Sequence, residues 1–410
     1  MGDPDLKTDL SNLQVLQFAP RVPWPLDTGA KLRNYHLART LSEKFRMTLL
    51  AFAERDAHSP ELKTVYERIE MVRRDAGYSL GKVLRGATGK TPLPLLNYTT
   101  KEMKQALAAL LNEQEFDLVQ VESIHLMNYL PTIRAALKPP LVVCDWHNVE
   151  SEVMRQYSER AKSFARRAYA NKTARLMDEA EKRALDQFDA HIVVSEQDAE
   201  RLSQINSSAQ VFVIENGVDA AYYATAQNGS GTKRRIVFVG SMDYHANIDA
   251  VINFARNVWP IVHGKKPELL FTIVGRDPSP AVRELSSIAG IEVTGSVKDV
   301  RPYYRESIAA VVPLRVGGGS RLKILEAMAA GIPVVSTTLG AEGLKVMPAE
   351  NILLADDDRD LAGKITKILE DETLRSRIVA AARALIAERY EWSTLGASLM
   401  NVYSNLLATR

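Results

Sequence analysis

The sequence contains a single cysteine, Cys144, and this scarcity excludes several kinds of site. One thiol cannot form an internal disulfide, and it cannot supply the paired cysteines of a CxxC-type zinc or redox site. The cysteine content is therefore typical of a protein from a reducing compartment.

Long apolar runs and a recognisable leader are also missing. No uninterrupted apolar stretch reaches the roughly 18 residues that a membrane-spanning helix needs. The first ten residues, MGDPDLKTDL, are polar and acidic, so we expect no cleavable secretory signal. Together these absences predict a cytoplasmic protein.

The chain has little excess charge of either sign. It has 52 Lys and Arg residues against 50 Asp and Glu residues, which gives a formal net charge of +2. Proteins that neutralise many duplex phosphates carry a larger positive excess, so we expect no nucleic acid partner. With 46% hydrophobic and 25% charged residues, the composition is that of a globular protein, and 410 residues predict two large domains or three small ones.

Short apolar segments alternate with amphipathic segments along the whole chain. The first half has apolar segments at 13–20, 47–52, 116–122, 139–147 and 189–195. The second half has five more, RIVFVG, LLFTIVG, IEVTG, AAVVPL and IPVVST. Strands that alternate with helices predict parallel sheets covered on both faces, so the predicted fold class is α/β, with two doubly wound Rossmann-like domains.

The Gly-, Ser- and Asn-rich segment 223–233 interrupts the alternation, and we interpret it as a linker or surface loop. It separates a predicted first domain, 1–222, from a predicted second domain, 234–389. A last helix is expected within 390–410 and is expected to pack back on the first domain. Because doubly wound sheets bind ligands at the carboxyl ends of their strands, two such sheets predict a cleft between the domains.

The strongest chemical signal is the segment VPLRVGGGSRLKILEAMAAGIPVVST, residues 312–337. Its glycines, Gly317–Gly319, let the backbone approach a ligand closely. Ser320 is a candidate N-cap for a helix whose first N–H groups form an anion site. Arg321 and Lys323 oppose the helix dipole in that first turn, which predicts a bound anion. The alternative, a glycine-rich loop with solvated basic residues, fits a lone G-G-G better than it fits the whole segment.

This segment resembles the donor-site signature of the retaining GT-B glycosyltransferases of family 4, the group 1 glycosyltransferases. That family usually has two glutamates separated by seven residues. Glu326 matches the second glutamate, which in the family holds the nucleotide ribose, whereas the first, which contacts the transferred sugar, falls on Gly318. The chain is similar to a subgroup with G-G-G-x-R-L-K in place of the first glutamate, and the likeness runs over about 13–406.

A basic pair that the family often carries after the first strand of the second domain, in the form G-R-L-x-x-x-K, is absent. The chain reads GSMDYHAN over 240–247. A departing diphosphate in a metal-free site still needs cations, so we assign that role to Arg321 and Lys323. In the family the loop matching Thr294–Val297 borders the nucleotide base. The expected donor-binding residues are Gly240, Ser241, Val297, Gly318, Gly319, Ser320 and Glu326.

Two further groups of candidates lie in the first domain. Asp27, Thr28 and Gly29 form a turn that in the resembled family faces the cleft, which makes them candidates for an acceptor or phosphate loop, although a capping turn fits equally well. This turn lacks the G-x-G-x-x-G pattern, which disfavours a dehydrogenase. His147 follows a strand, and the family commonly has a histidine there, close to the sugar or acceptor. A lone histidine is more often structural, but this position leads us to expect a catalytic residue.

The stretch 160–175 has six basic residues and no acidic one. A basic amphipathic helix can lie on an anionic membrane, although a solvated helix face is the commoner explanation. If the first interpretation holds, we expect weak peripheral association at the inner face of the membrane. The six residues are Arg160, Lys162, Arg166, Arg167, Lys172 and Arg175.

The resemblance implies transfer of a sugar from a nucleoside-diphosphate sugar with retention of anomeric configuration, in glycan, polysaccharide or glycolipid biosynthesis. It also implies that no metal or other cofactor is required. The acceptor stays open, because a lipid-linked sugar, a glycan and a small molecule all fit. Two alternatives are a GT-B sugar-nucleotide epimerase, which needs acid–base carboxylates and is disfavoured by Gly318, and a non-catalytic nucleotide-sugar-binding protein.

Overall fold

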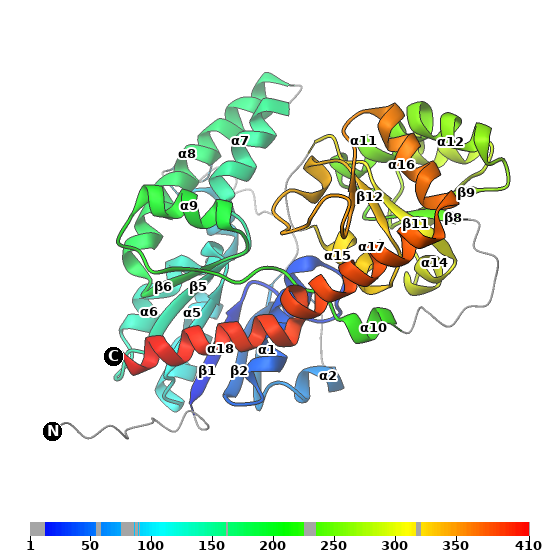
Figure 1. Cartoon of the computed structure of the whole chain (residues 1–410). Helices are drawn as coiled ribbons and strands as arrows, with labels where there is room; N and C mark the ends of the chain where they lie inside the picture. The colour runs from blue at the N-terminus through cyan, green and yellow to red at the C-terminus, as the bar shows by residue number, and fades with distance from the viewer. Residues whose placement is uncertain are drawn as a thin grey trace. The chain divides into compact units, whose positions relative to one another are not determined.

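The computed structural model describes residues 13–54, 59–74, 86, 89, 91–160, 163–224, 235–316 and 321–409. The chain divides into two compact units, and each is described by itself (Figure 1). The N-unit comprises Met1–Asn216 and Leu395–Arg410, and the C-unit comprises Gly217–Thr394.

The N-unit is built on a seven-stranded parallel sheet with the order β3-β2-β1-β4-β5-β6-β7. Its inner strands are buried almost throughout because helices cover both faces of the sheet, as Figure 1 shows. The free thiol of Cys144 lies fully buried in β5. The strands are β1 (Gln14–Ala19), β2 (Arg46–Ala53), β3 (Arg68–Arg73), β4 (Leu118–Glu122), β5 (Leu141–Trp146), β6 (Ala190–Val193) and β7 (Val211–Val213).

The helices of the N-unit begin where the sequence offers caps. The side chains of Thr28, Thr100, Ser163 and Ser195 each accept a hydrogen bond from a backbone N–H in the first turn of a helix. The helices are α1 (Gly29–Leu41), α2 (Pro60–Lys63), α4 (Leu93–Tyr98), α5 (Lys101–Glu113), α6 (Leu130–Arg134), α7 (Glu150–Arg160), α8 (Phe164–Gln187) and α9 (Glu196–Ile205), with a 3₁₀ turn at Ile124–Tyr129.

The C-unit is built on a six-stranded parallel sheet with the order β10-β9-β8-β11-β12-β13. The strands are β8 (Arg235–Val239), β9 (Leu270–Val274), β10 (Ile291–Gly295), β11 (Ser307–Val312), β12 (Val334–Ser336) and β13 (Leu353–Leu354). The α-helices are α10 (Ala220–Ala224), α11 (His245–Asn253), α12 (Trp259–Lys265), α13 (Pro280–Arg283), α14 (Arg301–Arg305), α15 (Leu322–Ala329), α16 (Asp358–Glu370) and α17 (Glu372–Leu385). Short 3₁₀ turns lie at Glu284–Ser287 and Leu339–Ala341, and π-helical turns lie at Phe254–Val258 and Ile386–Tyr390.

Each unit has its own hydrophobic core, and the border between the units follows from packing. Val218 belongs to the core of the C-unit, and its backbone N–H donates to the carbonyl oxygen of Tyr390. The border therefore lies a few residues before Tyr222, where the predicted first domain ends. The last helix, α18 (Trp392–Ala408), ends in the N-unit, where Gly396 approaches Thr40 and the Tyr403 hydroxyl donates to Gln120.

Two features of the fold bear directly on function. In each sheet the strand order reverses between two neighbouring central strands, β1 and β4 in the N-unit and β8 and β11 in the C-unit. Doubly wound sheets bind ligands beyond the carboxyl ends of the strands at such a point. Within the described part of the chain, every helix is too short or too polar to cross a membrane.

Candidate functional site

In the C-unit, the loops after β8 and β9 run side by side at the carboxyl edge of the sheet. The N–H of Gly240 donates to the carbonyl oxygen of Val274 (3.0 Å), and the N–H of Met242 donates to that of Arg276 (2.9 Å). A Cβ atom on Gly275 would lie 1.8 Å from the carbonyl oxygen of Gly240, so only glycine permits this approach. The positions of Gly240 and Ser241 are therefore fixed by backbone contacts.

Arg321 stands directly before α15 and is nearly buried, with 5% of its side chain exposed. Its Nη2 lies 3.3 Å from the Oε2 of Glu342, a carboxylate that is about half exposed. Burial lowers the pKa of Arg321, and the nearby Glu342 only partly opposes this effect. The guanidinium is thus a cation that the fold holds at an energetic cost.

Lys323 lies in the first turn of α15 and reaches back to the loop after β8. Its Nζ donates to the Oδ1 of Asn247 (2.6 Å) and lies 5.0 Å from the centre of the Phe238 ring. Burial and the neighbouring positive charge of Arg321 lower the pKa of Lys323 to about 8. Asn247 in turn donates from Nδ2 to the carbonyl oxygen of Ser241 (2.8 Å), which joins Lys323 to the end of β8.

Glu326 follows one turn later on α15 and is partly exposed. The hydroxyl of Tyr304 donates to its Oε2 (3.2 Å). Burial raises the pKa of Glu326, whereas hydrogen bonds from Tyr223 and Tyr304 and the charge of Lys323 lower it. Two tyrosines therefore hold the carboxylate that the resemblance assigns to the ribose.

The remaining predicted donor residues are a valine after β10 and the three residues directly before Arg321. Gly318, Gly319 and Ser320 lie outside the described residues. Val297 follows β10 and packs against the hydrophobic core of the C-unit. Gly295, two positions earlier, has a φ of 73°, which favours glycine at the end of this strand.

In the N-unit, a second polar cluster lies at the carboxyl ends of β4 and β5. His147, which directly follows β5, is hydrogen-bonded through Nε2 to the Oε2 of Glu122 at the end of β4 (3.0 Å). The side chain of His147 is 14% exposed and that of Glu122 is fully buried. Gln17 donates to the other oxygen of Glu122, and Asn34, with its amide nitrogen turned toward the cluster, donates to Oε2 (3.0 Å).

Burial raises the pKa of Glu122, and the hydrogen bond from His147 opposes that shift. The neighbouring Asp145 adds a second carboxylate, which also raises the pKa of Glu122. Asp145 itself is neutralised by Arg33, whose Nε lies 2.9 Å from Oδ2 and whose Nη2 lies 3.0 Å from Oδ1. Arg33 also donates to the carbonyl oxygens of Ile214 and Glu215, so this buried pair fastens α1 to the end of the unit's sheet.

The ligand atoms of Glu122, Asp145 and His147 lie within 4.8 Å of one another, a spacing that a metal ion could bridge. Both oxygens of Asp145 are already hydrogen-bonded to the Arg33 guanidinium, and His147 is hydrogen-bonded to Glu122. A cation at this point would have to displace Arg33, so the donor set fits a divalent metal poorly. The absence of a required metal stays a prediction.

Asp27, Thr28 and Gly29 form the start of α1. Thr28 is the N-cap, and its hydroxyl accepts from the N–H of Lys31 (3.4 Å), while the Nζ of Lys31 pairs with Asp27 (2.9 Å). This is the capping turn that the sequence also allowed. Their role in binding an acceptor or phosphate stays a prediction.

Several residues of the two clusters escaped prediction. Glu122 is the last residue of the buried strand β4. A carboxylate at the carboxyl end of an apolar run was the signal that could have predicted it. Arg276 comes two residues after β9, so a similar signal was available for it, whereas Asn247 and Arg33 meet their partners only through the fold.

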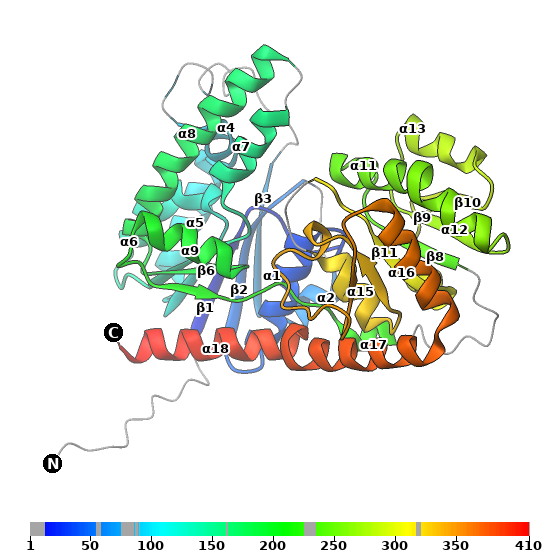
Figure 2. The same ribbon diagram turned by 45° about the horizontal axis from the view of Figure 1, so that its top comes forward.

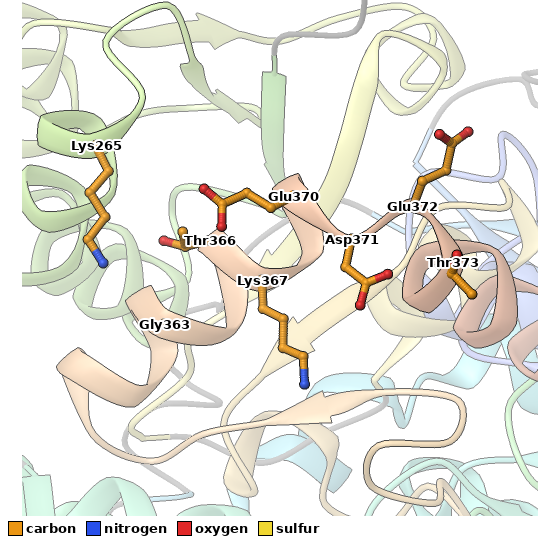
Figure 3. Close-up of a pocket in the computed structure, with 8 residues that line it drawn as sticks. All are labelled: Lys265, Gly363, Thr366, Lys367, Glu370, Asp371, Glu372 and Thr373. Carbon is orange, nitrogen blue, oxygen red and sulfur yellow. The ribbon is translucent and has the colours of Figure 1, made fainter.

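A depression of about 530 Å³ lies elsewhere on the C-unit, beside α16 and the start of α17 (Figure 3). Two lysines, three carboxylates and two threonines line it, with Gly363, and none of them was predicted as a site residue. Figure 3 shows Lys265 directed toward α16 from a neighbouring segment. With no apolar or aromatic side chain in its lining, the depression offers little to hold a small molecule.

Both halves of the chain match families of known proteins. Residues 28–222 match the family model described as Glycosyltransferase Family 4, and residues 233–371 match the model described as Glycosyl transferases group 1. A phosphatidyl-myo-inositol mannosyltransferase from Mycolicibacterium smegmatis is 32% identical over 202 residues, which are 47% of this chain and 51% of that protein. The chain thus matches about half the length of this curated relative.

Solved structures of other proteins are similar over nearly the whole chain, and two serve as examples. Sucrose-phosphate synthase from Thermosynechococcus elongatus has a TM-score of 0.69 at 18% identity, covering 97% of this chain and 100% of that chain. The Anabaena protein HepE, solved in complex with UDP and glucose, has a TM-score of 0.62 at 17% identity, covering 95% and 99%. At these identities the likeness concerns the fold alone.

Proposed function

Since the chain belongs to the family 4 glycosyltransferases and has the GT-B fold of two Rossmann-like domains, we propose that it transfers a sugar from a nucleoside-diphosphate sugar to an acceptor hydroxyl with retention of configuration. The observation that carries the proposal is the pair of cations, Arg321 and Lys323, at the start of α15. Both have a lowered pKa, so a bound anion would relieve a cost that the free protein bears.

The proposed chemistry places the diphosphate on these cations. The bond between the anomeric carbon and the diphosphate oxygen breaks, and the negative charge that develops on the leaving group is stabilised by Arg321 and Lys323. The acceptor oxygen bonds to the anomeric carbon from the same face, and a diphosphate oxygen takes the acceptor proton. No metal is needed in this scheme, because the protein itself supplies the positive charge.

Two other residues have separate proposed roles. Glu326 would accept hydrogen bonds from the ribose, since it is partly exposed and follows the two cations on α15. His147 would contact the sugar or acceptor, with Glu122 fixing its ring. Protonation of Glu122 would weaken this hold, because the neutral carboxyl is a poorer partner for the imidazole.

The proposal is tested with the full chain and a panel of nucleoside diphosphates and their sugars. A true ligand at 100 times its Kd should raise the free energy of unfolding by about 2.7 kcal/mol, which thermal denaturation detects. Slow release of nucleoside diphosphate from the stabilising donor, and faster release when acceptor is added, would establish turnover. Binding without any release would favour the non-catalytic alternative, and an NMR measurement of the product's anomeric configuration tests retention.

We also propose that the acceptor is lipid-linked and that the helical hairpin of α7 and α8 contacts an anionic membrane. Figure 2 shows the two helices side by side, extending beyond the sheet of their own unit. Phe164 at the start of α8 is 87% exposed, and Tyr157 and Tyr169 are also exposed. Arg166 and Arg167 lie beside Phe164 on the first turn and are exposed to solvent.

This arrangement predicts salt-sensitive sedimentation with vesicles that contain anionic lipid and none with neutral vesicles. Each basic residue near such a surface contributes about 1 kcal/mol, and salt weakens the attraction. Reversing Arg166 and Arg167 to Glu should abolish sedimentation and leave nucleotide binding unchanged. Arg201→Glu on α9 serves as a control for charge reversal in the same unit. If the wild type ignores anionic vesicles at low salt, the acceptor is better sought among soluble molecules.

A further inference from the structure

The loop over 240–247 lacks basic residues, yet it holds two basic side chains that come from other elements. Ser241 is hydrogen-bonded to Arg276, which follows β9, and Asn247 to Lys323, which lies on α15. We infer that Arg276 and Lys323 form a relocated cation pair that contacts the diphosphate, and that Ser241 and Asn247 position them. This assignment rests on the proposed function and adds Arg276 to its donor site.

The placement of Arg276 is set by contacts on both sides of it. Its carbonyl oxygen accepts from the N–H of Met242, and Gly275 packs against the backbone of Gly240. Its Nε donates to the Oγ of Ser241 (2.9 Å), and that hydroxyl donates onward to Asp243 (2.6 Å). The guanidinium is therefore drawn to the end of β8, at the point where the strand order of this sheet reverses.

Arg276 is exposed and, within the described part of the chain, it forms no ion pair with a carboxylate. Its contact with Ser241 uses Nε, which leaves the two Nη groups to donate to another acceptor. Paired Nη donors in a fixed plane match phosphate oxygens well. The side chain is thus anchored by one edge while the other edge is available to an anion.

Lys323 is held in the same manner by a neutral group. The Oδ1 of Asn247 accepts from Nζ, and the Nδ2 of Asn247 donates to the carbonyl oxygen of Ser241. A single hydrogen-bonded chain therefore runs from Arg276 through Ser241 and Asn247 to Lys323. Because both links are uncharged, they orient the cations without neutralising them.

The acidic groups near this chain do not cancel its charge. Asp243 contacts the Ser241 hydroxyl and is exposed, and Glu342 is about half exposed and pairs with Arg321. Glu326 lies on α15 and is held by tyrosine hydroxyls. Asp243 and Glu342 are open to solvent, whereas Glu326 opposes the lowering of the Lys323 pKa only in part, so Arg276, Arg321 and Lys323 keep positive charge for a diphosphate.

The test measures binding of UDP, GDP and inorganic pyrophosphate to the full chain by calorimetry. Arg276→Ala should weaken the bound nucleoside diphosphate and pyrophosphate by about 10- to 100-fold, the loss of a charge-assisted hydrogen bond. The matching nucleoside without phosphate should bind as it does to the wild type. Arg283→Ala is the control, because Arg283 is an exposed arginine of the same unit whose Nε donates to the carbonyl oxygen of Pro278.

The dependence of binding on salt should differ between the variants of the two cations. The loss in Arg276→Ala should shrink at high ionic strength because that side chain is exposed, whereas the loss in Lys323→Ala should persist. Ser241→Ala should give a smaller loss, which disappears when Arg276 is already Ala, as expected for a residue that acts through the arginine.

The outcomes distinguish this inference from the proposed function. If nucleoside diphosphates bind and Arg276→Ala binds them as tightly as the wild type, the inference is wrong and the proposed function stands. An equal loss for nucleoside and nucleoside diphosphate would also overturn it, because it would indicate a structural role. If neither UDP nor GDP binds but pyrophosphate does, and Arg276→Ala abolishes it, the anion site is supported and the proposed donor is wrong.

Discussion

The N-unit and the C-unit place polar clusters at equivalent points of similar sheets, yet the two clusters have opposite electrostatic character. In the N-unit the cation Arg33 is satisfied by Asp145 and by backbone carbonyls, and the group nearest to solvent is His147. In the C-unit the cations Arg321 and Lys323 both have a lowered pKa. Sheets of the same topology therefore hold one cluster whose cation is paired within the protein and another whose cations can bind an anion.

The contrast shows how to distinguish a structural charge from one that serves a ligand. A buried charge that stabilises the fold has a full set of partners, as Arg33 has. The two cations that we assign to a ligand, Arg321 and Lys323, instead have a pKa lowered by burial, which a bound anion would oppose. Two substitutions and a change of pH test this contrast between the clusters.

The largest effect is expected for Arg33→Met. The substitution leaves Asp145 buried without its countercharge, and breaking a buried pair from one side costs about 3 to 5 kcal/mol. Thermal denaturation should show an earlier transition. The matched change in the other cluster, Arg321→Met, should cost much less, because burial already disfavours that charge. Equal destabilisation by the two substitutions would contradict the contrast between the clusters.

A smaller effect is expected for Lys323→Met, which should leave stability unchanged or raise it while it weakens nucleoside diphosphate binding. Removing a buried ammonium removes its desolvation penalty, so the free protein should unfold at the same or a higher temperature. Nucleoside diphosphate binding should weaken by about 1.5 to 3 kcal/mol, the value of a hydrogen bond to a charged group. Calorimetric binding and thermal denaturation of the same sample decide both points. A clear loss of stability would make Lys323 a structural residue.

The smallest effect is a dependence of binding on pH. The pKa of Lys323 in the free protein is about 8, so raising the pH from 7 to 9 removes most of its charge. Nucleoside diphosphate affinity should fall over this range, approaching tenfold per pH unit above pH 8. In Lys323→Met the affinity should hardly change over the same range, and a similar slope in that variant would assign the titration to another group.

The same shift has a consequence for stability that also depends on pH. The pKa of Lys323 is lower in the folded than in the unfolded state, so between about pH 8 and 10 the unfolded chain binds more protons. The contribution of this group to the free energy of unfolding therefore rises with pH in this window. Binding and stability should respond to pH in opposite directions, which separates loss of the lysine charge from alkaline unfolding.

Much of the fold follows from the alternation of apolar and amphipathic segments. The predicted strands over 13–20, 47–52 and 139–147 appear as β1, β2 and β5, and all five strands predicted in the second half are present. Three strands were not predicted, β3, β7 and β13. Each is an edge strand, and edge strands need less hydrophobicity than the central strands that carried the signal.

The candidate site was predictable only where its chemistry lies in one continuous segment. Arg321, Lys323 and Glu326 lie within six residues of sequence, so their spacing on a helix was visible. Their hydrogen-bond partners lie far away in the sequence. Asn247, which accepts a hydrogen bond from Lys323, is 76 positions away. Spacing within a single sequence carries no information on contacts between segments so far apart.

The burial of Cys144 makes the protein a convenient starting point for spectroscopy. Its thiol is fully buried in β5, and burial raises its pKa well above the usual value, so it should resist maleimide reagents in the native state. A cysteine introduced at one exposed position, such as Ser296 beside Val297, would then be the only reactive thiol in the folded protein. A fluorophore or spin label attached there would report directly whether nucleotide reaches the loop that the family uses for the base.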